Sequence, residues 1–253
     1  MPICSLGSGS AGNATLLSLA NRLILIDCGF GVKDATRRLS LLGVAPEDIS
    51  TILVTHEHSD HIHGVESLAS KFNIPVCMTA GTRYSWKSKG RIEPQIITSG
   101  QEFFVGEVSV LPVAVPHDAR EPVQFVLTYK NTKVGVLTDL GKLSSHVVEA
   151  YSDCDALFVE ANHDLDMLAR GPYPSSLKRR VSGDWGHLNN RQTAELIKLV
   201  NANQTLKTLV IGHISQKNNH SEVTKKALSS VVADISNVVY ATQDEPLNWI
   251  EFS

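Results

Sequence analysis

Apolar residues along the chain fall into short runs at strand spacing and longer stretches at helical spacing. Ala14–Leu19 and Arg22–Asp27 are predicted to be two strands joined by a short turn, and Thr51–Val54 is a β-branched run typical of a buried strand. Val32–Leu42 carries apolar residues at helical spacing and stops at Gly43, which suits a helix C-terminus. The first part of the chain therefore predicts strands alternating with helices.

Strand patterns dominate the middle of the chain, and helix patterns return toward its end. The spacing predicts helices over 62–72, 190–200 and 221–232, and strands over 75–78, 101–105, 107–115, 122–129, 133–138, 156–160, 206–211 and 238–241. No repeat, low-complexity tract or linker divides the sequence. We therefore predict one domain, residues 1–253, of the α/β class: a four-layer αββα sandwich of two packed sheets with helices outside.

The composition is that of a soluble protein with a sizeable core, because 42% of the 253 residues are apolar and 19% are charged. No stretch approaches the ~18–20 continuous apolar residues of a membrane span, and the start lacks the features of a secretory signal. Four widely spaced cysteines without a CxxC pair indicate reduced thiols and a cytoplasmic protein. The net charge of −3 predicts no nucleic-acid partner by itself, so any such contact must be local.

The one compositional excess is histidine, with 10 residues, and their positions indicate a metal site. Thr55–His61 directly follows a predicted strand and has the pattern His-x-His-x-Asp-His. His56 and His58 lie two apart on extended backbone, so both imidazoles leave the same side and can share one ion. Asp60 and His61 lie where the chain should turn into the next helix. Imidazole and carboxylate suit Zn²⁺, Mn²⁺ or Fe²⁺, and four such ligands can begin two sites.

Three separate apolar strands each end in a further residue that can bind a metal. His117 follows residues 113–116, Asp139 follows 134–138, and His213 follows 209–212. Side chains at strand ends project from a rigid sheet into a shared cleft. Together with the histidine cluster, these three residues favour a metal centre over ordinary polar residues at strand ends.

A resemblance to a known family is carried by the segment Thr55–Gly64 together with Asp27, His117, Asp139 and His213. In these residues the chain resembles the metallo-β-lactamase fold, and the match spans nearly the whole chain. The resemblance implies two divalent ions per chain, zinc or manganese, with iron as a further option. It implies that the ligands of the first ion are His56, His58 and His117, that those of the second are Asp60, His61 and His213, and that Asp139 bridges both. It also implies that Asp27 supports the histidine cluster without ligating, which agrees with a strand-end carboxylate that accepts hydrogen bonds from the ligand loop.

Two segments in the second half resemble the RNase Z branch of that fold, which matures tRNA 3′ ends. They are Phe158–Ala161 and Trp185–Leu188. This resemblance implies that Glu160 orients His187, and that His187 protonates the departing oxygen as a general acid. Asp60 counts among the catalytic residues as well as the ligands. No separate substrate-binding arm like that of RNase Z is visible, so tRNA maturation is disfavoured.

A set of segments in the same order resembles the YycJ/WalJ proteins more closely. They are Leu6–Ala14, Pro116–Pro122, Thr138–Gly141, Glu160–Asp164, Gly171–Pro174, Gly186–Leu188 and Gly212–Ser215. The resemblance implies a 5′→3′ DNA exonuclease. Two ions about 3.5–4 Å apart can hold a bridging hydroxide at neutral pH and stabilise in-line displacement at phosphorus.

Several residues are candidates for substrate contact. Ser8, Ser10 and Asn13 lie in a glycine-rich opening and could donate to a phosphate or to the metal loops, although a plain tight turn is equally expected. Asn189, just before a predicted helix, would bring backbone N–H groups near a phosphate.

Two basic patches could hold a nucleic-acid backbone, or could be solvated charged faces. One is Lys178, Arg179 and Arg180. The other is Arg83, Lys87, Lys89 and Arg91 interleaved with Tyr84 and Trp86.

Four alternatives stay open beside the DNA exonuclease. A small-molecule phosphodiesterase acting on cyclic phosphates or nucleotide esters would need no basic tract. An RNA nuclease would use the same centre. A β-lactam or thioester hydrolase would not need the Glu160–His187 pair. A metal-stabilised module without turnover would need no complete ligand set, and turnover of a generic phosphodiester abolished by chelation would exclude it.

Overall fold

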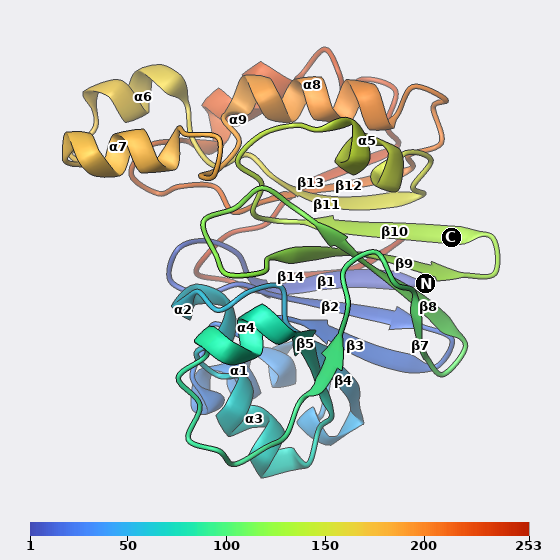
Figure 1. Cartoon of the computed structure of the whole chain (residues 1–253). Helices are drawn as coiled ribbons and strands as arrows, with labels where there is room; N and C mark the ends of the chain where they lie inside the picture. The colour runs from blue at the N-terminus through green and yellow to red at the C-terminus, as the bar shows by residue number, and fades with distance from the viewer. Residues whose placement is uncertain (253) are drawn as a thin grey trace.

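Two β-sheets packed face to face form the centre of the computed structural model, which describes residues 1–252 (Figure 1). The first sheet has the order β14-β1-β2-β3-β4-β5-β6, with the strands β1 (Pro2–Gly7), β2 (Ala14–Leu19), β3 (Arg22–Ile26), β4 (Ile49–Leu53), β5 (Val76–Thr79), β6 (Gln95–Ile97) and β14 (Leu247–Glu251). The second has the order β13-β12-β11-β10-β9-β8-β7, with the strands β7 (Phe103–Val105), β8 (Val108–Ala114), β9 (Val123–Tyr129), β10 (Thr132–Leu137), β11 (Ala156–Glu160), β12 (Thr208–Gly212) and β13 (Asn237–Tyr240).

Helices cover the outer face of each sheet (Figure 1). On the first sheet lie α1 (Val32–Leu41), α2 (Ser59–Ile62), α3 (Val65–Phe72) and α4 (Ala80–Ser85), with a 3₁₀ turn at Pro46–Asp48. On the second lie α5 (Ser145–Tyr151), α8 (Asn190–Val200) and α9 (Ser221–Leu228), while α6 (Leu165–Arg170) and α7 (Ser175–Val181) project at one end of the sandwich. None of the helices within residues 1–252 has the length and apolar character needed to cross a bilayer.

The apolar side chains form three layers of core because successive residues of a strand point to opposite faces. In β3, Ile24 and Ile26 pack between the two sheets, whereas Leu25 packs against the helices of the first sheet. In β11, Phe158 packs between the sheets and Leu157 packs against the helices of the second. This alternation confirms the predicted four-layer αββα sandwich.

Strand direction brings the ligand candidates to one end of the sandwich. Strands β3 to β6 run parallel to one another, as do β10 to β13. The carboxyl ends of parallel strands lie at the same edge of a sheet, and the loops that leave them therefore meet there.

Most predicted elements are present, and the differences have identifiable causes. The predicted helix over 62–72 is two helices, α2 and α3, because the N–H of Gly64 donates to the carbonyl of Cys28 (2.8 Å) instead of continuing a helical ladder. A side chain at Gly64 would also collide with the carbonyl of Phe30. Strands β1, β6 and β14 and helices α4 to α7 were not predicted. Strands β1 and β14, near the two ends of the chain, pair with each other, a contact that no local pattern reveals.

Candidate active site

The loop that leaves β4 supplies the first part of the site. His56 follows this strand, His58 is the N-cap of α2, and Asp60 and His61 lie within that helix. His56 and His61 are buried, whereas His58 and Asp60 are half-buried. The ring centroid of His56 lies 4.5 Å from that of His58 and 4.2 Å from that of His61. The loop therefore gathers four ionisable side chains in one place.

Asp27 anchors this loop from the end of β3. Its Oδ1 accepts a hydrogen bond from the backbone N–H of Thr55 (2.8 Å), and its Oδ2 accepts one from the Thr55 hydroxyl (2.7 Å). The same Oδ2 lies 2.8 Å from Nδ1 of His61. Asp27 has a φ of 61°, a left-handed conformation that costs free energy for a residue with a side chain. Its carboxylate is buried and held by two residues of the loop, which leaves it in a supporting position.

Three strands of the second sheet bring the remaining ligand candidates. These are β8, β10 and β12, which are followed by His117, Asp139 and His213, all three buried. His117 Nε2 lies 3.2 Å from His58 Nδ1. Asp139 Oδ2 lies 3.1 Å from His61 Nε2, and His213 Nε2 lies 3.8 Å from Asp60 Oδ2. Each of the three thus meets a residue of the first-sheet loop.

The histidines point one ring nitrogen at the centre of the cluster and bond the other to the protein. In the four buried ones Nδ1 faces a protein oxygen: the Thr55 hydroxyl for His56 (2.9 Å), Asp27 for His61 (2.8 Å), the Gly186 carbonyl for His117 (3.0 Å) and the Thr138 carbonyl for His213 (2.9 Å). In His58 the two ring nitrogens exchange these roles: Nε2 lies 3.1 Å from the Asp118 carbonyl, and Nδ1 faces His117. An outer partner of this kind fixes the ring orientation and tautomer of a metal-binding imidazole.

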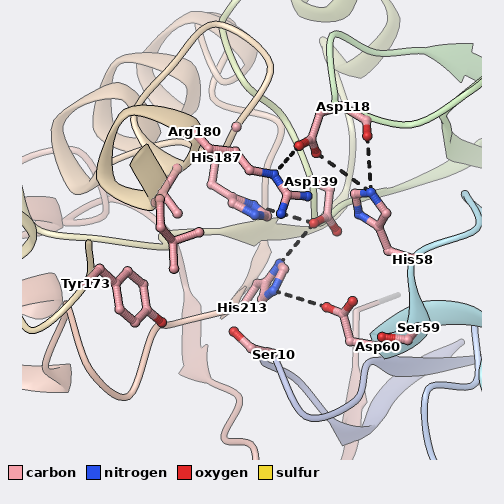
Figure 2. Close-up of a pocket in the computed structure, with 13 residues that line it drawn as sticks. Ser10, His58, Ser59, Asp60, Asp118, Asp139, Tyr173, Arg180, His187 and His213 are labelled. Atoms are coloured by element: carbon pink, nitrogen blue, oxygen red, sulfur yellow. Dashed lines mark hydrogen bonds and ion pairs between the residues drawn. The ribbon is translucent and has the colours of Figure 1, made fainter. Parts of the chain in front are cut away.

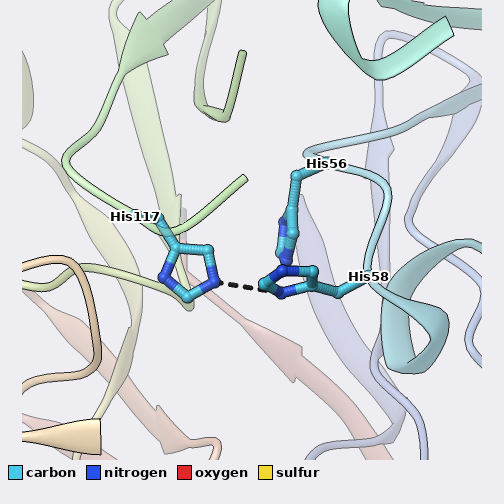
Figure 3. Close-up of side chains that lie close together, drawn as sticks. All are labelled: His56, His58 and His117. Carbon is cyan, nitrogen blue, oxygen red and sulfur yellow. Dashed lines mark hydrogen bonds between the residues drawn. The ribbon is translucent and has the colours of Figure 1, made fainter. Parts of the chain in front are cut away.

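The inward-facing atoms fit divalent cations. Five groups of side chains among the described residues each place one ligand atom within 4.8 Å of the others: His56, His58 and His117; His56, His61 and Asp139; Asp60, His61 and His213; His117, Asp139 and His187; and Glu160, His187 and His213. Figure 3 shows the rings of the first group converging. The buried Nε2 of His56 makes no hydrogen bond within the described residues. An unpaired buried acceptor is costly, and a bound cation would satisfy it.

Burial and charge act against each other in the cluster. Burial, aided by neighbouring histidines, lowers the pKa of His56 well below its usual range, which favours the neutral imidazole that metals bind. Burial opposes ionisation of Asp139, but His61 and His213 outweigh it and hold its pKa well below its usual range. Burial likewise opposes ionisation of Asp60, yet His61 lowers its pKa to about 2. Burial opposes the charge on His61 and His213, but Asp139 outweighs it, raising the pKa of His61 well above its usual range and that of His213 to about 9. A divalent cation would displace these protons, and imidazoles with ionised carboxylates then form a ligand set suited to zinc or manganese.

Glu160 and His187 form a pair beside this cluster. Glu160 ends β11 and is fully buried; its Oε1 accepts hydrogen bonds from the backbone N–H groups of Leu140 (2.7 Å) and Leu188 (3.1 Å). Its Oε2 lies 3.0 Å from Nδ1 of His187, which itself lies 3.4 Å from Asp139 Oδ1. Burial, with Asp139 nearby, raises the pKa of Glu160, and burial lowers the pKa of His187 to about 4. These opposite directions favour one proton shared between Oε2 and Nδ1 over a fully charged pair.

A pocket of about 350 Å³ opens over the cluster, as Figure 2 shows. It is lined by residues of both sheets and of α7, among them His58, Asp60, Asp139, His187, His213 and Arg180. Arg180 reaches toward the pocket from α7 and forms an ion pair with Asp118, whose carboxylate lies 3.6 Å from His117 Nε2. The pocket therefore presents a cation beside the ligand cluster, where a phosphate could meet both.

The glycine-rich segment near the start of the chain contacts the cluster more than it lines the pocket. Ser8 is buried; its hydroxyl accepts a hydrogen bond from the His213 backbone N–H (2.8 Å). Asn13, also buried, donates to Asp60 Oδ2 (3.3 Å) and lies 3.1 Å from His61 Nε2. Of the three predicted contacts, only Ser10 is exposed and lines the pocket. Ser8 and Asn13 thus contact the ligand residues, one of the two roles that the sequence left open.

Asn189 does not present free backbone groups to a phosphate, which corrects the expectation from the sequence. It is the N-cap of α8: its side chain accepts from the N–H groups of Arg191 and Gln192, and its own N–H donates to the Gln192 side chain (3.0 Å). The N–H of Asn190 donates to the His163 carbonyl (2.9 Å). A complete capping box uses these donors within the protein.

The three basic residues of α7 have different surroundings in the structure. Lys178 donates to the Ala169 carbonyl (2.7 Å), Arg179 is exposed, and Arg180 lines the pocket.

Two pocket residues, Asp118 and Tyr173, have no role predicted from the sequence. Asp118 directly follows His117, and this adjacency is the signal that could have identified it. Tyr173 lies in a Gly-Pro-Tyr-Pro segment, but its position over the pocket depends on how α6 and α7 fold (Figure 2).

The chain matches one protein family over most of its length and is similar to two named relatives over 90% of it. Residues 22–214 match the family described as "Beta-lactamase superfamily domain". The chain is 34% identical over 235 residues to exodeoxyribonuclease WalJ of Streptococcus pneumoniae (90% of this chain, 87% of the relative) and 33% identical over 236 residues to exodeoxyribonuclease YycJ of Bacillus anthracis (90% and 88%). Its fold is similar to that of the metallo-beta-lactamase fold protein YhfI from Bacillus subtilis (TM-score 0.73, 16% identity, 97% of both chains). Every ligand candidate, and the Glu160–His187 pair, lies within the matched residues.

Proposed function

The chain belongs to the beta-lactamase superfamily, and from this premise we propose that it is a metal-dependent DNA exonuclease that degrades strands in the 5′→3′ direction. The observation that carries the proposal is the similarity, over 90% of this chain, to two relatives that are both named exodeoxyribonucleases. The pocket supports it, because a ligand cluster, an acid–base pair and an arginine meet there.

We propose two divalent ions, zinc or manganese, as the cofactors. Their ligands would be His56, His58 and His117 for one ion and Asp60, His61 and His213 for the other, with Asp139 bridging. When bound, such a pair of ions activates water at neutral pH and stabilises negative charge on a phosphodiester. Asp27, Ser8 and Asn13 would hold these ligands in place through the contacts described above.

The side chains around the cluster would bind the phosphate and move a proton. Arg180, already beside Asp118, would pair with a non-bridging phosphate oxygen, since a guanidinium matches phosphate geometry. His187 would donate a proton from Nε2 to the departing oxygen, while Glu160 Oε2, 3.0 Å from Nδ1, holds the ring in that orientation. The half-exposed position of His187 at the pocket wall allows such contact with substrate.

The deciding experiment is a product ladder from end-labelled DNA and RNA with each metal supplied in turn. We expect mononucleotides from the 5′ end of DNA, with little RNA degradation, and complete loss on chelation. Products released from the 3′ end would refute the polarity, and faster RNA cleavage would refute the substrate. No cleavage of either polymer with any metal would refute the nuclease.

A small-molecule phosphodiesterase is the second candidate. The pocket of about 350 Å³ falls within the roughly 300–1,000 Å³ range of small-ligand sites, so it could accept a nucleotide ester alone. The response to salt separates the two candidates, as described below.

A further inference from the structure

A second pocket lies on the other side of α2 from the candidate active site. It has a volume of about 640 Å³ and is lined by residues of the α2–α3 region and of the segment that follows α4, including Trp86, Lys87 and Lys89. Ser59, the first residue of α2, lines both pockets. The two are therefore neighbours, and a polymer bound in one can continue into the other.

The segment 86–91 is held in place by a buried carboxylate. Glu66 of α3 accepts three hydrogen bonds from it: from the Ser88 hydroxyl (2.9 Å), the Lys89 backbone N–H (3.0 Å) and the Arg91 backbone N–H (3.0 Å). Because the backbone is bonded inward to Glu66, the side chains of Lys87, Lys89 and Arg91 are left exposed. The loop thus presents three cations from a fixed backbone.

Two aromatic rings accompany these cations. Trp86 is partly buried and packs on the core beneath the first sheet, which fixes its ring at the wall of the second pocket. Tyr84 does not line the pocket but directly precedes Ser85, which does; it is 82% exposed, and the guanidinium of Arg120 lies 5.4 Å from its ring centroid. Exposed aromatic rings beside cations are the usual platform for unpaired bases, because any base can stack on them.

The pocket is lined by two cations, Lys87 and Lys89, and two carboxylates, Glu57 and Glu66, and the cations are the more exposed. Glu66 is satisfied by its three hydrogen bonds, and Glu57 Oε1 accepts from the Arg120 N–H (2.8 Å). Arg83 lies 3.9 Å from Glu93, but within residues 1–252 neither Lys87 nor Lys89 forms an ion pair. On the other side of the active site, Lys178 and Arg180 of α7 are both engaged with protein groups. Arg179, the third basic residue of α7, is exposed but does not line the active-site pocket, whereas Lys87 and Lys89 line the second pocket.

We propose that this second pocket, with Tyr84, Trp86, Lys87 and Lys89, binds the unpaired DNA strand next to the scissile phosphate. The inference rests on the proposed nuclease function and adds the path of the substrate. Bases stack on Trp86 and Tyr84, the two lysines contact successive phosphates, and the strand passes over Ser59 to reach the metal ligands. The bound segment is single-stranded, since stacking on an exposed ring requires an unpaired base.

Two substrates and matched variants test this path. Tyr84→Ala and the double variant Lys87→Ser/Lys89→Ser change the surface; Phe104→Ala, also an exposed ring (65%), and Lys198→Ser/Lys226→Ser on α8 and α9 are the controls. Metal-loaded proteins are titrated by anisotropy with a phosphorothioate oligonucleotide of about 16 nucleotides, which resists cleavage. Hydrolysis of a nitrophenyl phosphodiester is measured in parallel.

We expect Kd for the oligonucleotide to rise about tenfold in Tyr84→Ala. In the double lysine variant the slope of log Kd against log salt should fall by about 1.4, or about 0.7 for each lost phosphate contact. The controls and the nitrophenyl ester should be unaffected. Unchanged Kd and slope would overturn the path while leaving the nuclease intact. An equal loss on the nitrophenyl ester would also overturn it, because the loop would then support the active site. Wild-type protein that binds DNA but cleaves none would refute the nuclease and not this surface.

Discussion

The two sheets contribute to the candidate site in different ways. The first supplies His56, His58, Asp60 and His61 from one short loop, held by a single carboxylate, Asp27. The second supplies its residues from four strand ends and a loop: His117, Asp139, Glu160, His187 and His213. One half is a local motif, and the other is assembled from segments distant in the sequence. The two proposed ligand sets, His56, His58 and His117 and Asp60, His61 and His213, each combine residues of the first-sheet loop with a residue of the second sheet, so both proposed ions would join the sheets.

The strongest test of this comparison removes one ligand from each half. His58→Ala and Asp139→Ala should each lower phosphodiester hydrolysis by about 10³-fold or more, because the charge stabilisation in the site is lost. The fold should persist, since the three apolar cores do not depend on an ion. Elemental analysis should find close to two metals per chain in the wild type, and Asp139→Ala should lose more metal than His58→Ala. Two bound metals with full activity in Asp139→Ala would overturn the bridging role.

A second test addresses the acid–base pair, which belongs wholly to the second-sheet half. His187→Ala should keep its metals but lose ~10²–10⁴ in rate on DNA, the usual contribution of a positioned general acid. The loss should shrink for a nitrophenolate leaving group, which departs without a proton. Glu160→Gln should show a weaker form of the same selectivity. If His187→Ala loses a metal, the residue is a ligand; if it slows both leaving groups equally, it binds the phosphate instead.

The local support of the first-sheet half can be tested at Asp27. Asp27→Asn keeps the shape but weakens the contact with His61 Nδ1, so metal affinity should fall by about 10–100-fold. Competition with a chelator measures this, and Asp234→Asn, at an exposed position, is the matched control. Unchanged affinity would mean that the loop keeps its geometry without the Asp27 charge.

A smaller effect on DNA processing is expected from the positive charges of α7, on the second-sheet side. Raising salt should weaken processing of long DNA far more than hydrolysis of a nitrophenyl phosphodiester, because only the polymer releases many counterions. Reversing the charge of Lys178, Arg179 and Arg180 should also weaken DNA processing, mainly through Arg180, which lines the pocket. KM measured over a salt series decides. Equal salt sensitivity of both substrates would favour the small-molecule phosphodiesterase.

The smallest effect concerns the stability of the loop beside the first-sheet half. Burial opposes the charge on Glu66, but the hydrogen bonds from Arg91, Lys89 and Ser88 outweigh it and lower its pKa. The ionised form therefore stabilises the fold above the unfolded pKa of about 4.3, and this contribution is lost as the pH falls through the lower folded value. Glu66→Gln should cost about 1 kcal/mol at neutral pH and progressively less in acid, as measured by urea unfolding. A pH-independent difference would assign the effect to packing.

The sequence determined the four-layer architecture and indicated the residues of the candidate site. Short apolar runs predicted most strands, since a strand buried on both faces carries apolar residues on both. The spacing of His56, His58, Asp60 and His61 predicted a shared ion. Only the tertiary structure decided which Nδ1 atoms are occupied by protein groups, that Ser8 and Asn13 face the ligands, and that Asn189 caps a helix. It also decided that the Trp86 segment adjoins the active site across α2. The reason is physical: residue spacing fixes directions along one element, whereas such contacts depend on how separate strands and helices pack.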